Sequence, residues 1–122
     1  MNPAKIGTAE LTTRLRATAR SHDLGVKAAV DLLIEHDTWL RKSTFVTRFV
    51  SYVHGSTYVD WLAVDKALEA NLRDLMVASS SELAVLRLAV FLARDPMRLA
   101  VLGSSNAEIA ARAFARALGV RS

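Results

Sequence analysis

The chain has 122 residues, of which 52% are apolar, and it carries 16 Lys/Arg against 12 Asp/Glu for a formal net charge of +4. This length suits one domain over residues 1–122 that buries about two-thirds of the surface of its unfolded form. Cysteine is absent, which excludes disulfides, thiolate catalysis and cysteine-ligated metal sites. No apolar segment approaches the roughly 20 residues of a membrane span, and we see no signal-peptide core at the N-terminus. We therefore expect a cytoplasmic protein with no membrane association.

Apolar residues recur at helical spacing through the first half of the chain, which predicts three helices. The first ends near His22-Asp23 and the second near Asp37, while basic residues and threonines occupy the positions between the apolar residues of the third. The apolar positions are Leu11, Leu15 and Ala19 in the first helix, Val26, Ala29, Val30 and Leu33 in the second, and Phe45, Val46, Phe49, Val50 and Val53 in the third.

The segment His54-Gly55-Ser56-Thr57 is the clearest interruption of this helical pattern. Gly55 can adopt a positive φ angle, and the β-branched and aromatic residues on both sides of it suit a short antiparallel pair. The sequence therefore leaves open a short β-hairpin over residues 50–61, as an alternative to a third helix that continues to Val53.

A fourth helix is predicted to begin after Asp60, which is a suitable N-cap, and to continue to Met76. It has the strongest amphipathic pattern in the chain. Its apolar positions are Trp61, Val64, Leu68, Leu72, Leu75 and Met76.

The most apolar segment of the chain follows the sequence Ser79-Ser80-Ser81-Glu82. These four residues have the pattern of a capping box, in which a serine hydroxyl and a glutamate carboxylate each accept a hydrogen bond from the other residue's backbone amide. The following residues, 83–93, are apolar except for Arg87. A helix that is apolar on nearly all sides is typically buried. We therefore expect residues 83–93 to form a buried central helix, with Leu88 in the core.

Asp95-Pro96 ends this central helix, because proline cannot continue it, and begins a short helix predicted over Pro96 to Leu102. Gly103 ends the short helix, and Ser105 begins a second capping-box pattern, Ser105-Asn106-Ala107-Glu108. A last helix follows, with the apolar positions Ile109, Ala113, Phe114 and Leu118. The predicted fold class is all-α: one compact domain of about six to seven helices around the buried helix 83–93.

Several short motifs resemble small helical proteins of unassigned function that are encoded by actinobacteria and their phages. The resemblance covers roughly residues 33 to 119 and implies a bacterial or phage protein of the cytoplasm, without implying any activity. The motifs are Trp39-Leu40, Gly55 with Tyr58-Val59-Asp60-Trp61, Ala67-Leu68-Glu69, Ser79 to Glu82 with Leu86-Arg87-Leu88-Ala89, and Leu102-Gly103 with Asn106.

Residues suited to catalysis or metal binding do not form a recognisable set. Two dipeptides, His22-Asp23 and His36-Asp37, have the residue types of a metal-dependent phosphohydrolase core, yet adjacent helical residues point about 100° apart. Both dipeptides fall at predicted helix ends, where they can act as caps. Serines and threonines lie at predicted helix starts or turns, and no glycine-rich phosphate loop is present. We expect neither an enzyme, nor a bound metal, nor a cofactor.

Charge is distributed unevenly along the chain. Residues 1–58 carry eight Lys/Arg against five Asp/Glu, residues 59–85 two against five, and residues 86–122 six against two, for net charges of +3, −3 and +4. Such segregation suits a basic face for nucleic acid, or pairing of the acidic segment with its basic neighbours or with another copy of the chain. We favour the second alternative, because carboxylates near the basic groups repel phosphate.

These observations favour a non-enzymatic interaction module with a protein partner or a tendency to self-associate. Trp39, Tyr52, Tyr58 and Trp61 cluster in sequence around Gly55, and aromatic residues often anchor interfaces. The alternative is that the same aromatic side chains only close the core.

Binding to DNA is the second functional hypothesis. Three helices followed by a hairpin is the element order of a winged helix, whose third helix enters the major groove. The residues that this helix would present to bases and phosphates are Arg41, Lys42, Thr44, Thr47 and Arg48.

Overall fold

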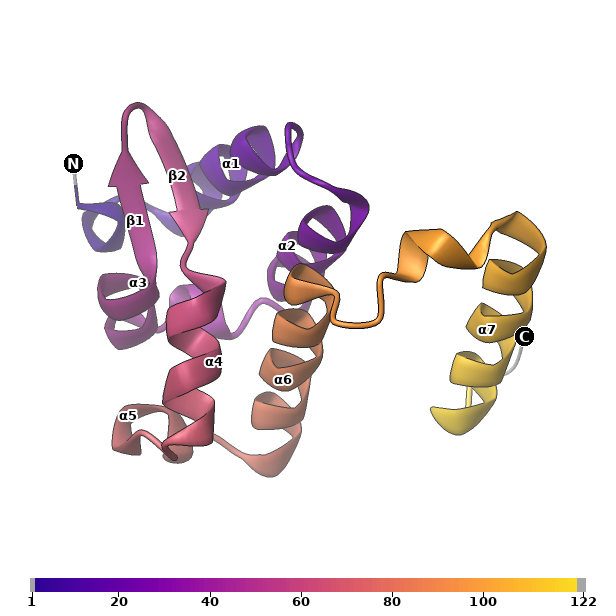
Figure 1. The fold of residues 1–122 in the computed structure, drawn as a ribbon. Coiled ribbons are helices and arrows are strands. Elements are labelled where there is room, and N and C mark those ends of the chain that lie inside the picture. Colours follow the sequence, from indigo (N-terminus) through magenta and orange to yellow (C-terminus); the bar gives the residue numbers. More distant parts are fainter. Residues whose placement is uncertain (1, 121–122) are drawn as a thin grey trace.

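The computed structural model describes residues 2–120, and its fold is all-α with one short hairpin (Figure 1). The prediction of an all-α domain with about six to seven helices is therefore confirmed. The α-helices are α1 (Thr8–Ala19), α2 (Leu24–His36), α3 (Ser43–Phe49), α4 (Trp61–Glu69), α5 (Arg73–Met76), α6 (Ser80–Arg94) and α7 (Ser104–Ala117). The strands are β1 (Val50–Val53) and β2 (Ser56–Val59), and the 3-10 turns are η1 (Pro3–Lys5), η2 (Trp39–Arg41) and η3 (Leu99–Leu102).

The core lies between α1, α2, α3, α4, α6 and the hairpin, and η2 and α5 also contribute buried side chains to it. The most extensive helix pairing joins α2 to α6, and α6 also packs against α4 on its other side. Gly25 makes the α2–α6 pairing close, because a Cβ atom at this position would collide with the carbonyl oxygen of Leu92. Leu86 and Ala89 of α6 face this core and are fully buried.

The hairpin left open by the sequence is present. β1 and β2 pair antiparallel, with Val50 opposite Val59 and Val53 opposite Ser56. The turn between them places His54 at a φ of 52° and Gly55 at 81°, which is the left-handed backbone that a tight hairpin turn requires. The third helix therefore ends at Phe49 and does not continue to Val53.

Two predicted helix caps are confirmed. The Asp60 carboxylate accepts a hydrogen bond from the backbone N–H of Ala63 at 3.0 Å. At the start of α6 both halves of the capping box form, since Ser79 Oγ accepts from the Glu82 N–H at 3.2 Å and Glu82 Oε1 accepts from the Ser79 N–H at 2.8 Å. This second contact lowers the pKa of Glu82, because the backbone hydrogen bond stabilises the charged carboxylate.

The fourth helix is shorter than predicted. It ends at Glu69, and a separate turn of helix, α5, follows. The chain reverses between them at Asn71, which has a φ of 51°; asparagine tolerates this left-handed conformation better than most residues. The reversal carries Leu75 back into the core, where it is 2% exposed. A straight helix to Met76 would have carried Leu75 away from the core.

Two predictions about the segment after α6 are also wrong. Pro96 does not begin a helix; instead Asp95 ends α6 with a φ of 40°, and its carboxylate accepts a hydrogen bond from the Leu99 N–H at 2.8 Å. Only the 3-10 turn η3 follows. Ser105 is not a cap either, because α7 begins at Ser104 after Gly103 and has no side-chain cap.

The prediction of a fully buried central helix needs the largest correction. Helix α6 spans the predicted residues, but only its α2-facing and α4-facing sides are covered. Ala84 is exposed, while Leu88 and Phe91 are only partly buried. Leu88 is therefore not a core residue. The apolar pattern correctly indicates a helix that packs in the core, but the described chain covers only two sides of it.

Candidate interaction surfaces

The basic residues predicted to read DNA are engaged with carboxylates in the structure. Arg48 lies 3.4 Å from the Asp74 carboxylate and Arg41 2.8 Å from that of Asp37. The Asp37 hydrogen bond raises the pKa of Arg41. Lys42 lies 4.8 Å from the centre of the Trp39 ring and 3.8 Å from the Glu82 carboxylate.

These acidic partners offset the positive charge of the predicted DNA-binding surface. Thr44 and Thr47 are exposed on α3 beside Arg48, so three of the five predicted side chains share one surface. Asp74 of α5 lines the same shallow hollow and places a negative charge where phosphate would have to approach. Helix α3 packs on η1, η2, β1, α4 and α5, whereas α2 packs mainly on α6. The structure therefore lacks the close pairing of second and third helices that a helix-turn-helix uses.

The four aromatic residues predicted as an interface do not form one surface. Trp39 is 1% exposed, packs against Phe45 with ring centres 5.4 Å apart, and donates its indole N–H to the Glu82 carbonyl at 2.9 Å. Its prediction as an interface residue is therefore wrong: Trp39 closes the core. Tyr52 and Tyr58 are exposed on the hairpin, and Trp61 is partly buried.

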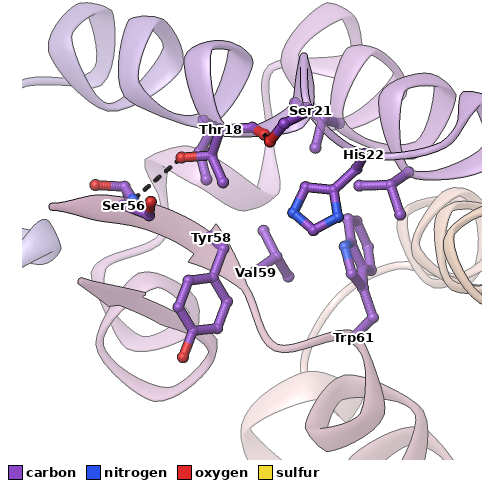
Figure 2. A pocket seen from close by; sticks show the side chains of 12 residues that line it. Thr18, Ser21, His22, Ser56, Tyr58, Val59 and Trp61 are labelled. Carbon is purple, nitrogen blue, oxygen red and sulfur yellow. Dashed lines mark hydrogen bonds between the residues drawn. The ribbon is translucent and has the colours of Figure 1, made fainter. Parts of the chain in front are cut away.

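A pocket of about 340 Å³ lies between α1, α2 and β2 (Figure 2). Its walls include the apolar residues Leu15, Val26 and Val59, and Figure 2 shows His22 and Trp61 close together at one end. The Thr57 N–H donates to Thr18 Oγ1 at 3.2 Å and ties the hairpin to α1 above this hollow. The pocket is mainly apolar and has the size of a small-molecule site. None of the described residues that line it carries a carboxylate. Its polar side chains are the His22 imidazole, the Trp61 indole and the hydroxyls of Thr18, Ser21, Ser56, Thr57 and Tyr58.

The C-terminal arm, defined as residues 95–120, stands away from the rest of the molecule (Figure 1). Within this described segment no residue is buried, and α7 packs closely only on η3. Ile109 is 56% exposed and Phe114 51% exposed; they lie about 140° apart around α7, with Ala113 and Ala117 between them, so the apolar side of the helix is broad. The other large apolar side chains exposed on the arm are Met97, Val101, Leu102, Leu118 and Val120.

A second incompletely covered surface is the outer stripe of α6, defined as Ala84, Leu88 and Phe91. These residues are separated by four and three positions, so they lie along one side of the helix. Near the end of α6, Leu24 is 73% exposed and precedes Gly25, whose backbone lies against the Leu92 carbonyl of α6. Neither predicted surface included the outer stripe, because the sequence pattern had placed its residues in the core.

Charged groups accompany both apolar surfaces. On α7, Arg112 and Arg116 are exposed and form no ion pair with another described residue. On the rest of the molecule, residues 2–94, which we call the body, Glu69 of α4 shares a surface hollow with Arg87 of α6. Glu69 likewise has no ion-pair partner among residues 2–120. The described arm carries three arginines against two carboxylates, and α4 carries two carboxylates against one lysine, so each is close to neutral and any charge complementarity lies in single groups.

Comparisons with known proteins identify no relative: no family model matches the chain, and neither a curated protein nor a solved structure matches it. Over the described part of the chain, no helix combines the length and apolarity needed to cross a membrane. Three or more potential metal-ligating side chains do not gather at any point within residues 2–120.

Proposed function

We propose that this protein is a non-enzymatic interaction module that self-associates through its C-terminal arm. The observation that carries the proposal is the unburied apolar face of α7, on which Ile109 and Phe114 are each more than half exposed. A helix of 14 residues is marginally stable in water by itself, and in proteins such helices gain most of their stability by packing an apolar face. Helix α7 has that face and needs a surface to cover it.

The exposed area supports the same proposal. Seven large apolar side chains of the described arm are each at least 40% exposed. Together they present on the order of 500 Å² of apolar surface, which is about the largest apolar patch that a monomeric protein usually exposes and is typical of interaction sites.

Light scattering during size-exclusion chromatography tests this proposal. We expect a mass of twice the 13.3 kDa chain, and a single-chain mass for Phe114→Asp with its helical circular dichroism retained. Ser105→Asp is the matched control, because it adds the same charge to α7 outside the apolar face, and it should leave the dimer intact. A wild-type protein that stays a monomer at high concentration would contradict self-association.

Binding to duplex DNA through α3 is a second candidate, and the element order α1, α2, α3, β1, β2 favours it. Its test is a salt titration of duplex binding with the wild type and with a variant in which Arg41, Lys42 and Arg48 are replaced by alanine. A DNA-binding module would lose about 0.9 from its logarithmic salt slope for each phosphate contact removed. We expect the wild type to show no such binding, because Asp74 and Asp37 lie beside these side chains.

A further inference from the structure

We infer that the arm of one copy docks on the outer stripe of α6 of a second copy, in a reciprocal exchange. This inference rests on the proposed self-association and names the surface that α7 covers. The stripe Ala84, Leu88 and Phe91 lies along one side of α6, and Ala113 lies on the apolar side of α7 between Ile109 and Phe114. Small alanine side chains near the centre of the α7 face allow two helices to approach closely.

The hinge between body and arm favours a second copy over the chain's own α6. Asp95 and Arg98 both have positive φ angles, of 40° and 53°, and the Asp95 carboxylate holds the Leu99 N–H. This geometry directs the chain away from α6 within four residues (Figure 1). A short hinge with strained backbone, followed by a helix that packs closely only on η3, is a setting that favours exchange between identical chains.

Charge complementarity also fits a second copy. Arg112 and Arg116 lie on the polar side of α7, and no described residue of their own chain pairs with them. The outer stripe of α6 adjoins α4, which carries Glu69 at the hollow that it shares with Arg87. An α7 seated on the stripe brings an arginine within reach of Glu69, which lies beside Arg87 of the acceptor, and a two-fold exchange forms this ion pair in both copies at once.

The area is sufficient for a stable dimer. Each arm would bury about 500 Å², and each acceptor stripe would bury less because Leu88 and Phe91 are only partly exposed, so two exchanges bury on the order of 1,500 Å² in total. This lies within the range of about 1,200–2,000 Å² that is typical of specific protein–protein interfaces. A single arm folded against its own α6 would bury about half as much.

The absence of cysteine from the sequence makes disulfide trapping a selective test. One chain carries Leu88→Cys at the centre of the stripe, and a second chain, distinguishable by mass, carries Ala113→Cys at the centre of the α7 face. Central positions meet whether the helices run parallel or antiparallel. Mixing under mild oxidation should yield the mixed disulfide, because bridging requires Cα atoms within about 7 Å.

Thr44→Cys on α3 is the matched control partner for Ala113→Cys, because it is exposed on a different part of the body. It should give at least tenfold less mixed disulfide than Leu88→Cys. Since Leu88→Cys could itself weaken docking, Leu88→Asp provides a second measurement. That variant should keep its helical circular dichroism and lose the dimer, as Phe114→Asp does.

The outcomes separate this inference from the proposed function. A dimer that forms a disulfide between two copies of Ala113→Cys, and none with Leu88→Cys, would show self-association through α7 alone and overturn the docking on α6. A disulfide within one chain of the double variant, at monomer mass, would show that the arm folds on its own α6 and overturn the exchange. A wild-type monomer with an unprotected α7 would overturn both proposals.

Discussion

The body, residues 2–94, and the arm, residues 95–120, use helices of similar amphipathic pattern with opposite results. In the body, Leu33 of α2 and Leu86 of α6 lie on apolar faces that are covered, and both are almost inaccessible. In the arm, Ile109 and Phe114 lie on the broad apolar side of α7 and remain more than half exposed. An apolar periodicity therefore shows that a helix needs a partner surface, but it does not say which chain provides it.

The sharpest test of this comparison places one charge in each region. Leu86→Asp should unfold the protein, because an unpaired carboxylate in the core costs several kcal/mol, comparable with the whole stability of a small domain. Ile109→Asp should leave the body folded. Thermal unfolding followed by circular dichroism measures both variants. A cooperative transition for Leu86→Asp close to that of the wild type would contradict the assignment of α6 to the core.

A smaller effect is expected at the α2–α6 contact. In Gly25→Ala the new Cβ would collide with the Leu92 carbonyl, so the helices must separate, at a cost of about 1–3 kcal/mol typical of overpacking. Gly7→Ser is the control, since a Cβ at Gly7 meets no atom within 4 Å, and it should not destabilise the protein. Urea denaturation provides both free energies. Equal stability of Gly25→Ala and wild type would argue against the close approach of α2 and α6.

The two serines that begin capping-box patterns, one in the body and one in the arm, should contribute differently to the free energy of unfolding. Ser79→Ala should cost about 1 kcal/mol, because it removes the acceptor for the Glu82 amide. Ser105→Ala should change the free energy of unfolding by no more than a few tenths, because Ser105 lies inside α7 and caps nothing. A larger loss for Ser105→Ala than for Ser79→Ala would reverse this assignment.

The smallest expected effect is a pH dependence that originates in the same cap. The folded-state pKa of Glu82 lies below its ordinary value of 4.5. The carboxylate therefore contributes stability above the unfolded-state pKa, and this contribution is lost as the pH falls through the lowered folded-state pKa. Glu82→Gln cannot titrate, so its stability should fall less on acidification. Urea denaturation at neutral and acidic pH measures the difference, and parallel losses in both proteins would contradict it.

The sequence by itself determined the elements whose causes are local. The capping box at Ser79 and Glu82, the cap at Asp60 and the turn at Gly55 each depend on residues within four positions of one another, so their chemistry can be recognised in one dimension. The α-helical class follows from apolar spacing in the same way. The helix break at Asn71 is also local, but asparagine occurs both in helix interiors and in left-handed turns. Its identity alone therefore did not predict that the helix ends there.

Only the tertiary structure decided which apolar faces are covered. The pattern of residues 83–93 predicted burial on every side, but the fold covers the sides that face α2 and α4, leaves Ala84 exposed, and covers Leu88 and Phe91 only in part. It also placed Trp39 in the core and set Asp74 beside Arg48, across 26 residues of sequence. Burial and ion pairing at such separations depend on how the chain folds back on itself, because the hydrophobic effect is non-directional and selects no partner from periodicity alone.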